Sequence, residues 1–515
     1  PDKTDARVYD AAIDDKEILT PLPGPAPRIN GPKIYGVRPN KKFIYRIPCQ
    51  GERPIDFEVA NLPETLILDE KTGIITGVSP SEKGEYKLKV TAKNGHGTVS
   101  RDFKLVVGDK IALTPPTGWN SWGGHMLMIT DEIMRKTADL YVEEGLADVG
   151  FQYISVDDCW MKMSPEAYFN RPQRKIEQHE GFDYEGLVGE VRDEDGNIIP
   201  NKNFPDMKAL TDYIHSFGLK AGLYSSPGYA TCQRFAGSQY HEALDAKQYA
   251  EWGFDLLKYD LCMGRDRLNE FKANGMDQAD FWEPMVKYLK IQDRDIFYNL
   301  CQYGQEDPWS WAPGLDIQSW RIGGDLNHNV ENYFEQALRI ATDLREYSKP
   351  GQWNDPDFMY IHKLTDHRKM VAPTKEIPLN TNERYQYATL WSIVAAPYFF
   401  SCNINEIDEF TIRLLANADV LNINQDELGH VGEVIRNKNE EVIIMKNLAG
   451  GAKAVAVFNR NSGNEAEIEL TWDEIGKGRE ISVYDVWRQK DLGVMKDGMK
   501  VKLSADGVGY FILGE

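Results

Sequence analysis

The sequence is short of three features: long hydrophobic runs, an excess of positive charge, and closely spaced cysteines. No stretch approaches the roughly 18 consecutive apolar residues that a membrane-spanning helix needs, so we expect no membrane span. The 59 Lys and Arg residues are outnumbered by 80 Asp and Glu residues, and the net charge of −21 would repel nucleic acid and anionic lipid. The six cysteines form neither a CxxC pair nor a Cys/His cluster at zinc spacing. We therefore expect no metal, no cofactor and no nucleic-acid partner.

The remaining composition is that of a globular protein, with 42% hydrophobic and 27% charged residues. At roughly one domain per 150 residues, the 515-residue chain suggests about three domains. The chain opens at Pro1 without a signal peptide, so we interpret it as a mature or trimmed form.

Two β-rich regions flank a region of mixed pattern. Residues 1–30 contain four prolines in alternation and predict an extended linker or strap. Residues 31–108 alternate apolar and polar side chains around the turn signal Asn94-Gly95, which predicts a small β-sandwich. This sandwich resembles the immunoglobulin-like modules that precede catalytic domains in bacterial carbohydrate enzymes. Residues 430–515 predict a C-terminal antiparallel β-sandwich domain.

Residues 109–429 repeat strand and helix. Apolar spacing of 3, 4 and 3 predicts a helix over 206–217 with Asp206 as its N-cap, and a strand follows at 219–224. A second helix over 242–252 precedes a strand at 254–259. This repeat predicts a parallel (β/α)8 TIM barrel. The eight expected strand ends lie near Trp122, Asp157, Tyr224, Asp260, Cys301, Asp325, Asp357 and Cys402.

Polar residues recur at these expected strand ends, and in a barrel such ends surround one mouth, where active sites lie. A mouth with many carboxylates and no set of metal-ligating histidines suits glycoside hydrolysis, in which one carboxylate attacks the anomeric carbon and another protonates the leaving oxygen. For any single aspartate, a helix N-cap or a surface ion pair is the alternative interpretation.

Six collinear motifs carry a resemblance to glycoside hydrolase family 27, which contains α-galactosidases and α-N-acetylgalactosaminidases. The motifs are Gly118-Trp119-Asn120-Ser121-Trp122, Asp157-Asp158-Cys159-Trp160, Leu257-Lys258-Tyr259-Asp260, Ser319-Trp320-Arg321 with Asp325, Trp353-Asn354-Asp355-Pro356-Asp357, and Asn424-Gln425-Asp426. The resemblance implies a retaining exo-α-galactosidase that acts on terminal α-linked galactose by double displacement.

In this resemblance Asp260 matches the nucleophile and Asp325 the acid/base. Lys258 lies two residues before Asp260 on the same face of a strand, where a cation would keep the aspartate ionised; a structural ion pair is the alternative. Asp325 needs a raised pKa, which repulsion from Asp260 across about 5 to 5.5 Å would supply once the sugar excludes water. Arg321 matches the residue that holds the 2-hydroxyl region.

The resemblance also implies the remaining substrate contacts. Asp157 and Asp158 match the pair that binds the 4- and 6-hydroxyls, and we expect their strand to end there so that both can face the sugar. Further matches are Trp122, Tyr224, Cys232, Gln302 and Asp357. A disulfide between Cys232 and Cys262 is implied, with two buried thiols as the alternative. Cys159 and Cys301 lack their family partners and are expected to be free.

The sugar is inferred with less support than the chemistry. The bulky Gln302 and Gln305 and the unlengthened Asp157-Asp158 pair favour galactose over N-acetylgalactosamine or β-L-arabinopyranose, which stay alternatives. An inactive galactose-binding protein is the non-enzyme alternative. The long segments 161–203 and 359–381 are expected to overhang the mouth and to shape an aglycone subsite. The implied disulfide favours a secreted, periplasmic or cell-surface-associated protein; the oligomeric state stays open.

Overall fold

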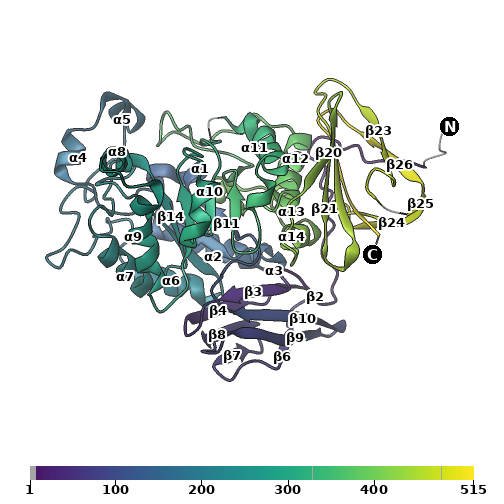
Figure 1. The fold of residues 1–515 in the computed structure, drawn as a ribbon, viewed down its shortest axis with the longest axis horizontal. Helices are drawn as coiled ribbons and strands as arrows, with labels where there is room; N and C mark the ends of the chain where they lie inside the picture. The colour runs from purple at the N-terminus through teal and green to yellow at the C-terminus, as the bar shows by residue number, and fades with distance from the viewer. Residues whose placement is uncertain (1–6, 328, 477, 515) are drawn as a thin grey trace.

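The computed structural model describes residues 7–327, 329–476 and 478–514. The barrel carries an N-terminal β-sandwich below it and a C-terminal β domain at its right in the view of Figure 1. In the described parts of the chain, none of the helices is both long and apolar enough to cross a membrane.

The N-terminal β-sandwich packs a four-stranded sheet, in the order β3-β10-β9-β6, on a three-stranded sheet, in the order β4-β8-β7. The Asn94-Gly95 signal lies between β9 and β10, which pair antiparallel along their whole length, as predicted. The strands are β2 (Arg28–Ile29), β3 (Ile34–Val37), β4 (Lys42–Arg46), β5 (Cys49–Gln50), β6 (Asp56–Ala60), β7 (Leu66–Asp69), β8 (Ile74–Val78), β9 (Gly84–Asn94) and β10 (Gly97–Val107).

Nine parallel strands form the barrel sheet, in the order β17-β16-β15-β14-β13-β12-β11-β19-β18. The two strands at the ends of this order, β17 and β18, are separated by only three residues of chain, so together they form a broken seventh strand that closes the ring. The strands are β11 (Thr117–Asn120), β12 (Tyr153–Ser155), β13 (Lys220–Ser225), β14 (Leu256–Asp260), β15 (Phe297–Cys301), β16 (Ser319–Arg321), β17 (Trp353–Asp355), β18 (Met359–Tyr360) and β19 (Tyr398–Ser401). The predicted TIM barrel is confirmed.

Helices alternate with these strands and form an outer layer (Figure 1). Both helices predicted in detail are present as α6 and α7, and Asp206 caps α6 by accepting the Ala209 amide at 2.9 Å. The helices are α1 (Trp122–His125), α2 (Asp131–Glu143), α3 (Leu146–Val149), α4 (Pro165–Phe169), α5 (Gln173–Gln178), α6 (Met207–Ser216), α7 (Glu242–Trp252), α8 (Arg265–Ala273), α9 (Gln278–Lys290), α10 (Pro308–Trp311), α11 (Tyr333–Thr342), α12 (Thr381–Ile393), α13 (Glu409–Leu415) and α14 (Ala418–Asn424).

The observed strand ends coincide with the expected ones at Asp260 and Cys301, and they differ by one residue at Tyr224 and Cys402, by two at Trp122, Asp157 and Asp357, and by four at Asp325. β11 ends at Asn120, and Trp122 already begins α1. β16 ends at Arg321, so Asp325 lies four residues beyond it, after the turn that contains Gly323 and Gly324.

The C-terminal domain has a six-stranded sheet, in the order β20-β21-β22-β27-β24-β25, and a three-stranded sheet, β1-β26-β23. The strands are β20 (Glu433–Lys438), β21 (Glu441–Asn447), β22 (Lys453–Asn459), β23 (Ala466–Thr471), β24 (Glu480–Asp485), β25 (Lys490–Lys496), β26 (Gly498–Leu503) and β27 (Val508–Leu513). The predicted antiparallel β-sandwich is confirmed, with one addition from the other end of the chain.

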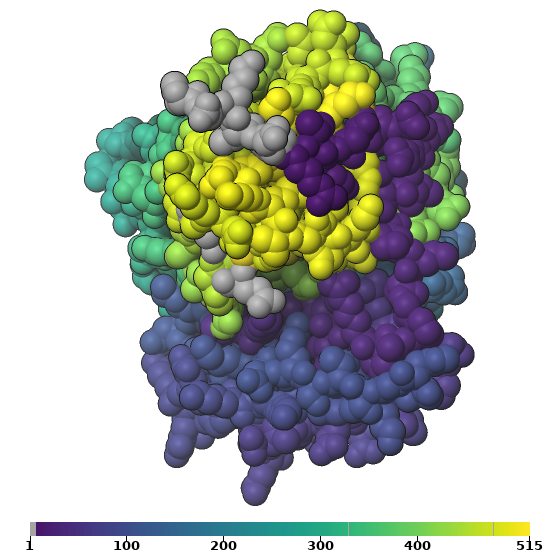
Figure 2. All heavy atoms as spheres, turned by 90° about the vertical axis from the view of Figure 1, so that its right-hand side faces the viewer, coloured from purple at the N-terminus to yellow at the C-terminus, as the bar shows by residue number. Residues whose placement is uncertain are grey.

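That addition is β1 (Arg7–Asp10), which pairs in parallel with β26. The chain then crosses the barrel: the Leu19 amide bonds the Tyr385 hydroxyl at 3.0 Å, and Asn417 bonds the Thr20 hydroxyl at 3.2 Å. Figure 2 shows this N-terminal segment lying on the surface of the C-terminal domain. Of the two forms expected for residues 1–30, the described part, from residue 7 onward, is a strap.

The N-terminal β-sandwich packs on the amino ends of the barrel strands. The Lys42 amide bonds the Asp293 carbonyl at 2.7 Å, and Arg38 pairs with Asp295 at 2.9 Å, just before β15 begins. Because catalytic groups gather at the opposite, carboxyl ends of barrel strands, this domain lies away from the mouth.

Candidate active site

A cavity of about 440 Å³ opens at the carboxyl ends of the barrel strands. Strands β13, β14 and β16 each end in its wall, and loops that follow other strands complete it. Its wall contains Trp122, Asp157, Asp158, Tyr224, Cys232, Lys258, Asp260, Arg321, Asp325 and Asp357 among others. The structure therefore brings together every predicted site residue except Gln302.

Asp260, the last residue of β14, lies at the floor of the cavity and is 6% exposed. Its carboxylate accepts hydrogen bonds from the Tyr303 hydroxyl at 2.6 Å and the Tyr224 hydroxyl at 3.2 Å. Burial raises the pKa of Asp260 to about 6, against the opposing effects of Lys258 and the Tyr303 hydrogen bond. Near neutral pH the group is mostly ionised, as an attacking carboxylate must be.

Lys258 does not pair with Asp260, although both side chains line the cavity. Its ammonium group lies 2.8 Å from Asp157, which also accepts a hydrogen bond from Asn120 at 2.9 Å. Lys258 therefore acts on Asp260 through space, and burial outweighs that attraction. The expected effect of Lys258, which favours the ionised form of Asp260, is thus joined by that of the Tyr303 hydrogen bond.

The adjacent carboxylates Asp157 and Asp158 both reach the cavity because β12 ends at Ser155, as expected. Asp158 accepts hydrogen bonds from the amides of Cys159 at 2.7 Å and Gln233 at 2.9 Å. Burial nevertheless raises the pKa of Asp158 to about 7. Such a buried carboxyl needs hydroxyl partners, so it can select a ligand by its hydroxyl pattern.

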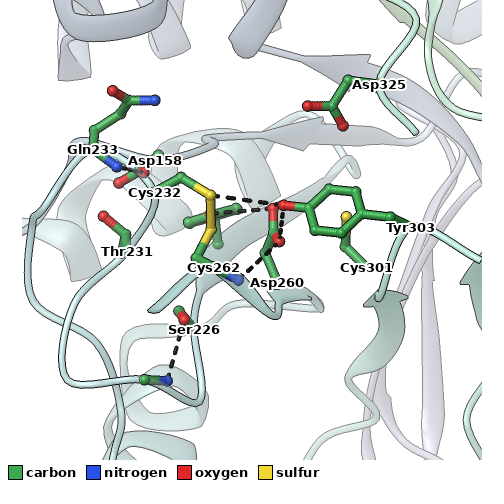
Figure 3. The surroundings of a disulfide bond; sticks show 12 residues. Asp158, Ser226, Thr231, Cys232, Gln233, Asp260, Cys262, Cys301, Tyr303 and Asp325 are labelled. Atoms are coloured by element: carbon green, nitrogen blue, oxygen red, sulfur yellow. Dashed lines mark hydrogen bonds between the residues drawn. A yellow bond between two sulfur atoms is a disulfide. The ribbon is translucent and has the colours of Figure 1, made fainter. Parts of the chain in front are cut away.

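Asp325 lies on the loop after β16, whereas Asp260 ends β14, and Figure 3 shows Asp325 above the Tyr303 ring, away from the end that contacts Asp260. Arg321 approaches its carboxylate at 3.3 Å and also pairs with Asp357 at 3.1 Å. The side chain of Asp325 is 38% exposed, so a sugar in the cavity would withdraw it from water.

Four residues of this site have positive φ angles although they are not glycine. Asp357, in the break of the seventh strand, has φ 101°, and Arg234 has φ 74°. Tyr303 has φ 57° and Cys262 has φ 22°. Such backbone costs about 1 to 3 kcal/mol per residue and gathers at active sites, where the fold must aim particular side chains.

This geometry agrees with the comparison to family models. The model described as "Alpha galactosidase A" matches residues 114–178 and 184–426, more than half of the chain. The chain belongs to glycoside hydrolase family 27. The model of the α-galactosidase C-terminal β-sandwich domain matches residues 438–513, and the one named "Putative Ig domain" matches 26–108.

Individual relatives match between 78% and 96% of the length of this family 27 hydrolase. The α-galactosidase of Cyamopsis tetragonoloba is 31% identical over 83% of this chain and 92% of its own. A solved Bacteroides fragilis structure, named as a putative α-galactosidase/melibiase, is 32% identical and covers 96% of this chain and 99% of its own, with a TM-score of 0.82. α-Galactosidase I from Mortierella vinacea is 26% identical over 78% of this chain and 97% of its own, with a TM-score of 0.64.

Gln302 is not part of the cavity of this hydrolase, contrary to expectation. Its fully buried amide bonds Trp282 at 2.7 Å and Gln278 at 2.9 Å, on the helix side of β15. Gln305 is exposed and does not line the cavity either. Side chains alternate along a strand, so the residue after Cys301 turns outward, and the one after that is free to turn in.

Tyr303 is the residue that sequence reasoning missed. It lines the cavity and donates the shortest hydrogen bond to Asp260. Its left-handed backbone is followed by Gly304, where a Cβ atom would lie 2.1 Å from the Ile322 carbonyl oxygen. The dipeptide Tyr303-Gly304 was the available signal, because a glycine after a strand end marks a tight turn.

Tyr303→Phe is expected to move the acidic limb of the kcat/KM profile upward by about one pH unit. The Tyr303 hydrogen bond favours the ionised form of Asp260 and so lowers its pKa; without it, that pKa rises and activity is lost at a higher pH. The profile of kcat/KM against pH measures this. Tyr240→Phe, at an exposed position outside the cavity, is the control, and matching profiles for the two variants would refute the role.

The predicted disulfide between Cys232 and Cys262 is present and lies beside Asp260 (Figure 3). The four other cysteines, all within the described chain, are free and buried, among them Cys159 and Cys301 as expected. The disulfide links the loop after β13 to the residue two positions beyond Asp260, and both cysteines line the cavity. It therefore fixes one wall of the site to its floor.

The double variant Cys232→Ser/Cys262→Ser is expected to lose about 3 to 4 kcal/mol of unfolding free energy, the loop-closure value for a separation of this size. Thermal unfolding with and without reductant measures the change. Reductant should lower the Tm of the parent protein but not that of the double variant. Equal Tm values for the parent and the double variant would contradict the prediction.

Both long insertions contribute to the cavity wall, as expected. Residues of α5 come from the segment 161–203, and Tyr360, His367 and Met370 come from the segment 359–381. The cavity therefore extends beyond the residues of the family motifs.

Proposed function

We propose that this family 27 hydrolase is a retaining exo-α-galactosidase that releases terminal α-linked galactose from oligo- or polysaccharides. One observation carries the proposal: the buried Asp260 carboxylate, aimed by two tyrosine hydroxyls, faces the same cavity as Asp325. A pair of carboxylates of different exposure suits the two roles of a retaining mechanism.

In the first step Asp260 attacks the anomeric carbon while Asp325 protonates the departing glycosidic oxygen. A covalent galactosyl-aspartate forms and the aglycone leaves with that proton. In the second step Asp325, now ionised, takes a proton from water, whose oxygen displaces Asp260 from the anomeric carbon. The two inversions give a product with the α configuration of the substrate.

Galactose is proposed as the sugar on two grounds. The Asp157-Asp158 pair, with Lys258 bound to Asp157, offers a charged site for neighbouring hydroxyls. The named relatives are α-galactosidases or are so described. Gln302 and Gln305, which favoured galactose in the sequence analysis, lie outside the cavity and therefore do not support the choice of sugar. Because a disulfide persists in oxidising compartments, we propose a secreted, periplasmic or cell-surface location.

Proton NMR of the first-released sugar tests the mechanism. We expect α-galactose to appear first from an aryl α-galactoside and then to mutarotate; β-galactose first would overturn retention. The matched aryl α-N-acetylgalactosaminide and aryl β-L-arabinopyranoside test the sugar. Higher kcat/KM for either of them would overturn the choice of galactose, and sugar binding without turnover would overturn the enzyme itself.

A further inference from the structure

One part of the cavity wall is basic. Arg174, Lys175, Arg234 and Arg265 all line the cavity. Arg174 and Lys175 come from α5, Arg234 from the disulfide loop, and Arg265 from the start of α8. Among the residues that the structure describes, none of these four forms an ion pair with a carboxylate, although 39 other ion pairs are present.

This lack of partners stands out against the charge of the chain. With 80 Asp and Glu residues against 59 Lys and Arg residues, a cation is easily paired. Arg267, only two residues after Arg265, pairs with Glu242 at 2.6 Å, and Arg192 pairs with Asp245 at 2.6 Å. The four cations of the basic wall are thus left with free charge that faces the cavity.

Three of these cations, Arg174, Lys175 and Arg234, lie close enough to repel one another. Burial lowers the pKa of Lys175 to about 8, Arg174 and Arg234 lower it further, and Asp158 opposes them. The Lys175 ammonium donates to the neutral Gln233 side chain at 2.7 Å rather than to a carboxylate. Like charges held together destabilise the free protein, and an anionic ligand would relieve that repulsion.

Depth in the cavity decides which part of a substrate meets this wall. The floor holds the buried carboxylates Asp157, Asp158 and Asp260, which would repel an anionic sugar. Arg174 and Arg265 are exposed and therefore lie at the rim. For an exo-acting enzyme, the terminal sugar occupies the floor and the leaving group extends toward the rim.

We propose that the basic wall binds an anionic group, a carboxylate or a sulfate, on the leaving-group side of the substrate, so that this hydrolase prefers galactosides with an acidic aglycone. The inference rests on the proposed function.

Matched disaccharides test the preference. α-Galactosyl-glucuronic acid and α-galactosyl-glucose 6-sulfate are compared with neutral α-galactosyl-glucose at low and at high salt. We expect at least one acidic substrate to show kcat/KM about tenfold above the neutral one at low salt, with the advantage falling as salt rises. The acidic substrate whose kcat/KM exceeds that of the neutral one shows whether the wall prefers a carboxylate or a sulfate. Equal kcat/KM for all three would overturn the inference.

Variants locate the effect. Arg174→Gln and Arg265→Gln are each expected to lower the acidic-to-neutral ratio of kcat/KM about threefold to tenfold, and Arg174→Glu should lower it further. Lys93→Gln, which removes the same charge from the exposed surface of the N-terminal sandwich, is the matched control. An unchanged ratio in all cavity variants would refute the basic wall as the cause.

The two proposals fail in different ways. If the proposed function is wrong, no α-galactoside is turned over, whether neutral or acidic. If the proposed function is right but the basic wall does not bind an anionic aglycone, the aryl α-galactoside and the neutral disaccharide are hydrolysed, and an acidic aglycone does not raise kcat/KM. A preference for an anionic group on the galactose ring itself would also contradict the inference, because it would place the anion among the floor carboxylates.

Discussion

Replacing Asp260 with Asn is expected to lower kcat on an aryl α-galactoside by about 10⁴-fold or more. The amide keeps the shape of the carboxylate and can still meet the Tyr303 and Tyr224 hydroxyls, but it cannot form the covalent intermediate. Folding should change little, so Tm and far-UV circular dichroism should match the parent. Steady-state kinetics with the aryl substrate measures the loss.

Added azide sharpens this test. A small anion can take the place of the missing carboxylate and attack the anomeric carbon once, which gives the β-galactosyl azide. Asp212→Asn, on the exposed face of α6, is the matched control and should keep parental activity. Substantial activity in the Asp260 variant, or an azide product of α configuration, would contradict its role as nucleophile.

Replacing Asp325 with Ala is expected to have an effect that depends on the leaving group. A sugar leaving group needs a proton, so kcat/KM for α-galactosyl-glucose should fall about 10² to 10⁴-fold. A nitrophenolate leaves without help, so its release in the first step should change much less. The second step loses its base, so the covalent intermediate should accumulate and a burst of nitrophenolate should precede slow turnover.

Stopped-flow release of nitrophenolate and mass spectrometry of the trapped protein measure this behaviour. The mass should rise by one galactosyl residue, attached at Asp260. A loss of equal size for every leaving group, without a burst, would contradict the acid/base assignment. It would instead favour a structural role for Asp325 in its contact with Arg321.

The barrel and the position of Asp260 could be predicted because they depend on patterns within short stretches of sequence. Apolar spacing and the Asp206 cap define α6, and the helix over 242–252 is observed with the predicted bounds. Asp260 ends β14 and so lies at the mouth, where a parallel barrel brings its strand ends together. The disulfide followed from the family resemblance rather than from the spacing of its cysteines.

Side-chain direction and pairing across the chain were not predictable in the same way. One step of strand alternation turns Gln302 to the helix side and lets Tyr303 face Asp260. Lys258 lies within reach of both Asp157 and Asp260, and only the packed structure decides in favour of Asp157. The lack of ion pairs in the basic wall likewise depends on which carboxylates lie nearby in the folded protein, and a short stretch of sequence does not predict these neighbours.

The pairing of β1 with β26 constrains the order in which the chain can fold during its synthesis. Arg7 lies opposite Met499, so a ribosome makes one partner almost an entire chain before the other. Until then the strap has no strand to join, and its contacts with Tyr385 and Asn417 must also wait for the barrel. This parallel pair therefore cannot close before β26 has been synthesised, and until then the N-terminal strap of a growing chain should stay open to proteases.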